Sequence, residues 1–132
     1  MYYTGTALVI QVVDQGQHRI DYYPIENNAI SSVQSTEISG NLIAGEGNVL
    51  WVQYGQLISA INVVSNGFLP VTGININEPI ISTQSHGQDL FVLTESGILR
   101  YGLSLSNIPT IEQQSFTLLE NQDGFIVNNQ SL

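Results

Sequence analysis

Cysteine is absent from the 132-residue chain, which excludes disulfides, cysteine metal sites and thiol catalysis. Cysteine-free proteins occur on both sides of a membrane, so this absence leaves the compartment open. Lysine is absent too. Arg19 and Arg100 are the only fixed positive charges, and the formal net charge is −9. Because nucleic acid and anionic lipid headgroups repel a chain this acidic, we expect neither as a partner.

The N-terminal region lacks the long hydrophobic run that a membrane anchor needs. The apolar stretch Ala7–Val13 is interrupted by Gln11 and followed by Asp14, and no basic residue precedes it. It is too short to span a bilayer and lacks the charge pattern of a signal peptide. The sequence therefore predicts neither a signal peptide nor membrane insertion.

Apolar residues make up 42 % of the chain, whereas charged residues make up only 10 %. Globular domains usually contain about a quarter charged residues, so polarity here comes mainly from Asn, Gln, Ser and Thr. The length suits one domain with a substantial core. We expect residues 1–132 to form a single globular domain.

Three segments of the chain repeat one pattern. Gly5, Gly47 and Gly87 each precede a leucine by three residues, and the glycines are 42 and 40 residues apart (47 − 5 and 87 − 47). Each leucine begins an apolar run that ends in a turn, where glycine supplies the positive φ of a tight hairpin. The second apolar runs are Arg19–Tyr23, Leu57–Ile61 and Ile98–Tyr101. Alternation and β-branched residues predict strands throughout, and hence an all-β fold.

Further short strands are expected on either side of each hairpin. They are Asn41–Ala44 and Pro79–Ser82 before the glycine, and Ile30–Val33, Phe68–Val71 and Ile108–Ile111 after the hairpin. Four strands in about 40 residues is the size of a β-propeller blade. The repeat units span residues 1–39, 40–78 and 79–123, and a closing strand lies in 124–132. In this scheme the chain starts at the second strand of its first unit.

The closing strand is placed by a second internal match. Ser32-Val33 followed by Leu42-Ile43 matches Ser115-Phe116 followed by Phe125-Ile126. The matching positions of both pairs are 83 residues apart (125 − 42). Phe125, Ile126 and Val127 are therefore expected to supply the strand that the first unit lacks.

This pattern resembles the repeats of β-propeller proteins of the PQQ and YVTN types. It consists of a strand, the motif Gly-x-x-Leu-aromatic-Val, a turn and the motif Leu-x-x-Tyr/Ile. The resemblance covers nearly the whole chain and implies three four-stranded blades. Propellers have four to eight blades, so three imply self-association, and a homodimer gives a six-bladed ring. Trp51 is the only tryptophan, so the PQQ-type docking signature is incomplete and no cofactor is implied.

Two other architectures remain open at this point. A β-trefoil also contains three repeats of about 40 residues and closes as a monomer, although the contiguous tight hairpins favour the propeller. The residues can also be a piece of a longer propeller chain. Propellers host binding, scaffolding and catalysis alike, so the resemblance does not choose a function.

The turns that begin each hairpin supply the first candidate ligand-binding residues. Glu46 and Asn48 flank Gly47, and His86 and Asp89 lie around Gly87. In a propeller such turns gather at one end of the ring, where they form a rim. Asp and Asn are also common in turns for conformational reasons alone.

Two tyrosines complete the candidate rim. Tyr54 and Tyr101 lie near predicted strand ends, and a tyrosine face beside Asn, Gln and Asp suits a sugar ring. His18 between Asp14 and Asp21 offers an acid-base or metal pair, but ordinary turn chemistry explains it better.

No phosphate loop, nucleophile elbow, paired histidine ligands or dinucleotide fingerprint occurs in the sequence. We therefore predict no catalytic residues, no metal site and no cofactor, and an enzyme is the least supported class. The sequence favours a structural or interaction module that binds itself and presents a rigid surface to a protein partner. The alternative is a lectin-like protein that binds glycans at repeated sites.

Overall fold

The computed structural model of the protein describes residues 1–65, 67–104, 110–121 and 124–129, with 117–121 and 124–129 described by their backbone alone. These residues form strands and turns and contain no helix, which confirms the predicted all-β class. Within these ranges, no helix could span a lipid bilayer.

Three antiparallel sheets follow one another along the chain. The first contains β1 (Tyr2–Tyr3), β2 (Ala7–Asp14), β3 (Gln17–Glu26), β4 (Ala29–Ile30) and β5 (Gln34–Ile38). The second contains β6 (Asn41–Glu46), β7 (Val49–Tyr54), β8 (Leu57–Val64) and β9 (Gly67–Asn75). The third contains β10 (Ser82–His86), β11 (Asp89–Thr94), β12 (Gly97–Ser104), β13 (Thr110–Asn121) and β14 (Gly124–Asn129). In the described strands no backbone ladder joins one sheet to another.

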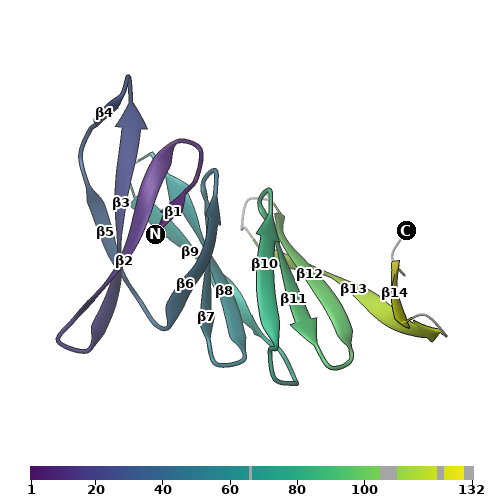
Figure 1. Ribbon diagram of the computed structural model, residues 1–132. Coiled ribbons are helices and arrows are strands. Elements are labelled where there is room, and N and C mark those ends of the chain that lie inside the picture. The colour runs from purple at the N-terminus through teal and green to yellow at the C-terminus, as the bar shows by residue number, and fades with distance from the viewer. Residues whose placement is uncertain (66, 105–109, 122–123, 130–132) are drawn as a thin grey trace.

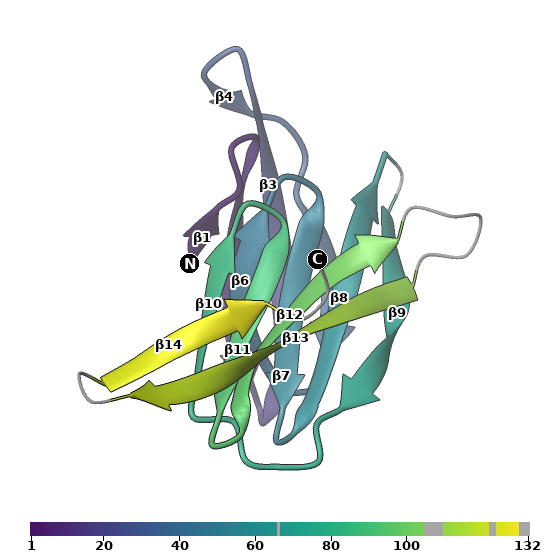
Figure 2. The same ribbon diagram turned by 90° about the vertical axis from the view of Figure 1, so that its right-hand side faces the viewer.

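The sheets stand side by side in a row with their faces packed together, and the second sheet lies in the middle (Figures 1 and 2). Successive side chains of a strand point to opposite faces, so both faces of β7 can be apolar. Leu50 and Val52 pack towards the first sheet, while Val49 and Trp51 pack towards the third; all four are at most 3 % exposed. A buried sheet of this kind needs near-continuous apolar strands.

Two separate cores result from this arrangement. The core between the first and second sheets is formed by Ala7, Val9, Ile20, Tyr22, Leu42, Leu50, Val52, Ile61 and Val63. The core between the second and third sheets is formed by Ala44, Val49, Trp51, Ile58, Ala60, Val71, Ile76, Leu90, Val92 and Tyr101. The repeated leucine thus lies in a core in the second and third sheets.

A few hydrogen bonds fix each sheet against its neighbour. The side-chain amide of Gln11 in β2 bonds the backbone at the start of the second sheet. Its Oε1 accepts from Leu42 N at 3.0 Å, and its Nε2 donates to Gly40 O at 3.0 Å. Between the second and third sheets, Trp51 Nε1 donates to Gln88 O at 3.2 Å. These contacts set the register in which the apolar faces meet.

The first sheet corrects one expectation, because its first strand is partly present. β1 precedes β2 and pairs Tyr2 with Val9 and Tyr3 with Leu8. The same register joins Ala44 to Trp51 in the second sheet. Two residues were too few to show an alternating pattern. Beyond Val9, no described strand pairs with this edge of β2.

The other flanking strands agree with the sequence in part. Asn41–Ala44 and Phe68–Val71 lie within β6 and β9, but Ser31–Val33 are not in a strand. Pro79–Ile81 precede β10, where proline has no amide proton for a ladder. Residues 108 and 109 lie outside the described residues. Residues 124–128 form a strand, as predicted, but β14 pairs with β13 of its own chain.

The junction between the first two sheets predicts a sharp difference between two glycines with the same φ of +101°. A Cβ at Gly40 would lie 2.2 Å from Gln53 O, whereas a Cβ at Gly5 meets nothing within 4 Å. We expect Gly40→Ala to lower the free energy of unfolding by about 1–3 kcal/mol more than Gly5→Ala, because only the first also overpacks. Urea unfolding followed by circular dichroism measures both; equal losses would contradict the close packing of Gly40 against β7.

Candidate functional site

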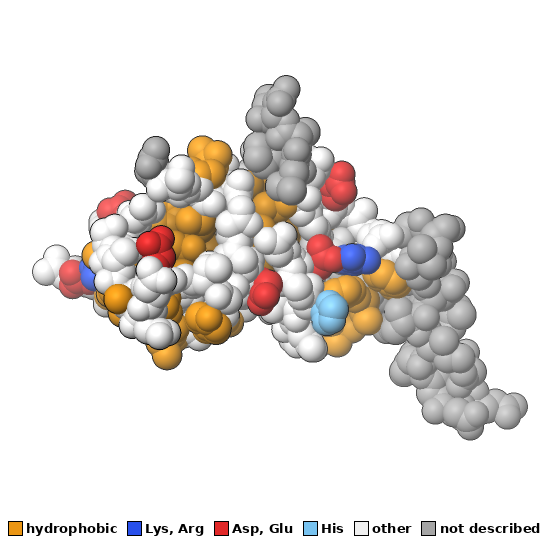
Figure 3. All heavy atoms as spheres, turned by 90° about the horizontal axis from the view of Figure 1, so that it is seen from above, with side chains coloured by type: hydrophobic (Ala, Val, Ile, Leu, Met, Phe, Trp, Pro, Cys, Tyr) orange, Lys and Arg blue, Asp and Glu red, His pale blue; other side chains and the backbone are white. Residues whose placement is uncertain are grey.

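The turns that begin the second and third hairpins lie at the same end of the molecule, as the rim hypothesis requires. Figure 3 looks onto this end and shows a mainly uncharged surface with separated acidic groups. Glu46, Asn48 and His86 are all exposed there. Asn48 Nδ2 donates to Asn62 Oδ1 at 3.0 Å, and Gln88 Nε2 donates to Asn48 Oδ1 at 3.0 Å. The rim is thus a chain of amides that joins two sheets.

The other candidate residues are not part of this chain of amides. Asp89 accepts from Arg100 Nε at 2.9 Å on the outer face of the third sheet, and Nη2 of the same arginine donates to it as well. Tyr101 is 0 % exposed, and burial raises the pKa of its hydroxyl. Its side chain lines a cavity of about 310 Å³ between the second and third sheets, together with Glu78 and Ser96.

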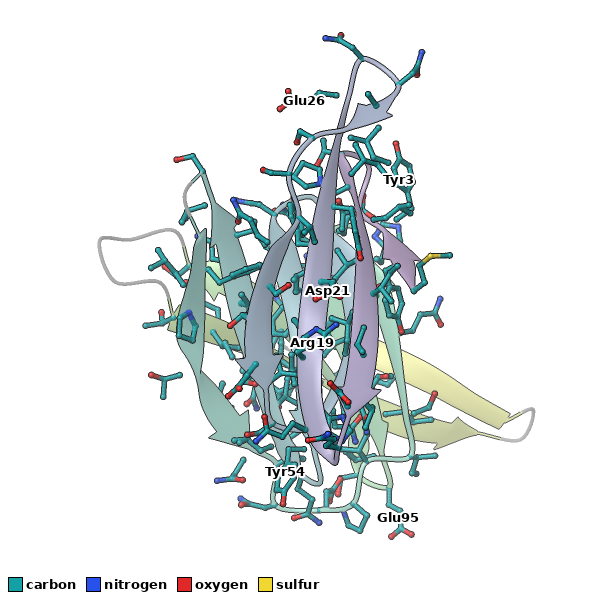
Figure 4. All side chains as sticks on the ribbon, turned by 90° about the vertical axis from the view of Figure 1, so that its left-hand side faces the viewer. Tyr3, Arg19, Asp21, Glu26, Tyr54 and Glu95 are labelled. Carbon is teal, nitrogen blue, oxygen red and sulfur yellow. The ribbon has the colours of Figure 1, made fainter. Side chains whose placement is uncertain are left out.

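Tyr54 lies at the opposite end of the molecule, where β7 turns into β8 (Figure 4). Its side chain is 64 % exposed and lines an open hollow of about 940 Å³ between the first and second sheets. His18, Glu37, Asn41 and Gln53 line the same hollow. A ring beside amide and carboxylate groups is the arrangement that the sugar hypothesis needs, but the sequence pattern singles out neither Glu37, Asn41 nor Gln53 as a ligand-binding residue.

His18 faces this seam and not the neighbouring aspartates. Its Nδ1 lies 2.8 Å from Gln11 Nε2, and because the amide oxygen of Gln11 accepts from Leu42 N, the amide nitrogen is the donor towards Nδ1. The carboxylate-histidine pair considered from the sequence does not form. In the described side chains no group of three His, Asp or Glu residues could hold a metal ion.

The two outermost sheets each leave one apolar face without a second layer. The front face of the first sheet, defined by Leu8, Ile10, Val12 and Tyr23, lies opposite to the core residues of the same strands. All four side chains are half-buried, and no sheet of the described chain packs on them.

The back face of the third sheet is its counterpart at the other end of the row. It is defined by Phe91, Leu93, Ile98 and Phe116, which are also half-buried. The Phe91 and Phe116 ring centroids lie 6.5 Å apart, and the Arg100 guanidinium lies 5.8 Å from the Phe91 centroid. These contacts arrange an aromatic surface beside the Arg100–Asp89 ion pair.

Arg19 and Asp21 form an ion pair on the front face, as Figure 4 shows. Arg19 Nε donates to Asp21 Oδ1 at 2.9 Å, and Ser35 Oγ donates to the same oxygen at 2.7 Å. The bonds from Arg19, followed by the bond from Ser35, hold the pKa of Asp21 below its ordinary value, although burial acts in the opposite direction. Both arginines of the chain therefore lie paired on the two outer faces.

The first sheet also has an open edge. Ile25 N donates to Thr6 O, so by alternation Gln11 and Val13 direct their backbone amide groups away from β3. β1 pairs only with Leu8 and Val9, whereas β6 pairs with β7 from Val49 to Gln53. The only sequence signal for this edge is the expectation that the first unit lacks a strand.

No protein-family model matches the chain, and a search of the curated proteins finds no match.

The Arg19–Asp21 pair predicts a pH-dependent stability. Because the folded-state pKa of Asp21 is lowered, its contribution is present near neutral pH and is lost as the pH falls below about 4. We expect Asp21→Asn to melt a few degrees below the wild type near neutral pH, and this gap to close in acid. Thermal melts across pH measure it, with Glu26→Gln, an exposed acid on the same strand, as control. A gap that stays constant in acid would contradict the ion pair.

Proposed function

We propose that the protein is a non-catalytic interaction module whose three sheets are propeller blades, and that it self-assembles, most simply as a homodimer with six blades. The assembled β platform then presents its amide-rich rim to a protein partner. The single observation that carries this proposal is the pair of apolar faces at the two ends of the row. An isolated sheet stack gains by covering such faces.

The topology supports the blade interpretation over the trefoil. A trefoil needs strands of different repeats to pair in one barrel, whereas each of the three described sheets pairs only within itself. The middle sheet is covered on both sides, as a blade in a ring is. The two end sheets are covered on one side only, which is what an incomplete ring leaves.

A second function, glycan binding, is favoured by the hollow at Tyr54. The exposed ring can stack on a sugar, while Asn41, Gln53 and Glu37 can bond hydroxyl groups. A glycan array separates this function from the first: a lectin binds a defined set of sugars and loses them in Tyr54→Ala, whereas a scaffold shows no preference.

The native mass tests the proposed assembly. We expect light scattering behind a sizing column to give twice 14.4 kDa, with dissociation on dilution. Leu69→Glu serves as control and is expected to keep the wild-type mass, because the Leu69 side chain is 47 % exposed and lies on neither outer face. A wild-type protein that remains monomeric at high concentration would contradict self-assembly.

A further inference from the structure

Because the three sheets repeat one sequence pattern, each outer face has counterparts among the faces that pack together between the sheets. Leu8 of the front face corresponds to Leu50 and Leu90, which are both 0 % exposed because a preceding sheet covers them. Phe91 of the back face corresponds to Trp51, which is 1 % exposed because a following sheet covers it. Among the described residues, no sheet packs on the front face of the first sheet or on the back face of the third.

The uncovered front face of the first sheet and the uncovered back face of the third sheet are complementary. Inside the chain a back face always meets a front face: Val9 packs with Leu50 between the first two sheets, and Trp51 packs with Leu90 between the last two. We propose that the back face of the third sheet binds the front face of the first sheet of a second copy, and that a two-fold axis repeats this contact. The proposal rests on the proposed self-assembly and specifies its interface.

Contacts of this kind are heterologous, because two different surfaces meet. Two such contacts in a dimer use both faces of each chain and leave neither apolar face in water. The ion pairs fit this arrangement, since Arg19 and Arg100 are each neutralised by an aspartate on their own face. Glu37, opposite Arg19, and Glu112, opposite Gly102, also lie on these faces and are exposed, so the contact must leave both carboxylates in water at its rim.

The C-terminal strand lies where this contact needs it. β6 follows β5 along the chain and starts the second sheet, whereas β14, which follows β13, pairs with β13. β13 pairs with β12 through Thr110–Thr117, and its last residues carry β14 away from the row, on the side opposite to the second sheet (Figures 1 and 2). A second copy on the back face brings its open β2 edge, at Gln11 and Val13, to this side. β14 can then extend that edge by backbone pairing.

Mixing two variants tests the face assignment. Ile10→Glu damages only the front face and Phe91→Glu only the back face, since an unpaired carboxylate is costly to bury. Each variant alone has no intact front-to-back pair, so we expect its dimer dissociation constant to rise at least about 30-fold. An equimolar mixture retains one intact pair, so native mass spectrometry, with a mass tag on one variant, is expected to show a 1:1 heterodimer.

The outcomes separate this inference from the proposed function. A monomeric wild type overturns both. If the wild type is a dimer and one single variant stays dimeric, the interface is isologous and only the face assignment fails. A mixture that forms no heterodimer at the highest concentration reached also overturns it. Circular dichroism checks folding, and Leu8→Gln with Leu93→Gln replaces any acidic variant that unfolds.

Discussion

The fold depends on the packing of apolar sheet faces against one another. A strand such as β7, with Leu50 and Trp51 on opposite sides, is stable only in a sheet that is covered twice. The second sheet meets this condition between its two neighbours. The first and third sheets follow the same pattern but have one neighbour each. The shape of the chain and the self-association proposed for it therefore have one physical cause.

The unusual composition follows from the same constraint. A stack of sheets with apolar faces has little surface on which long charged side chains are needed. The two arginines lie on the outer faces in ion pairs. The rim, which lies at one end of the strands, is formed by amides such as Asn48 and Gln88. Amides can join neighbouring sheets without the desolvation that buried charges impose. A low charge content is thus compatible with a well-ordered surface.

Much of the architecture could be predicted from the spacing of glycine and leucine, because each hairpin is a local structure with its own turn signal. The class and the hairpins of the second and third sheets follow from this pattern. The two-residue strand β1 could not be found in this way, since only its long-range pairing to Leu8 and Val9 defines it. The breaks near Ser31 and Pro79 likewise reflect local deviations that an averaged repeat conceals.

The candidate site was less predictable than the fold. The pattern shows that Glu46, Asn48 and His86 share one end, but it does not show which side chains are covered. Tyr101 is buried by the second sheet, and Tyr54 belongs to the opposite end. The role of Gln11 depends on a side-chain amide that contacts residues 29 and 31 positions away (40 − 11 and 42 − 11). Such contacts have no local sequence signal.

Hydroxyl-radical footprinting of the concentrated wild-type protein tests the central claim most directly, because it reports the solvent accessibility of individual side chains. Leu8 and Phe91 are predicted to be protected as strongly as the core residue Trp51, while Tyr54 is labelled freely. The protection of Leu8 and Phe91 should fall together on dilution. Labelling of both in proportion to their half-buried state, unchanged by concentration, would contradict the account.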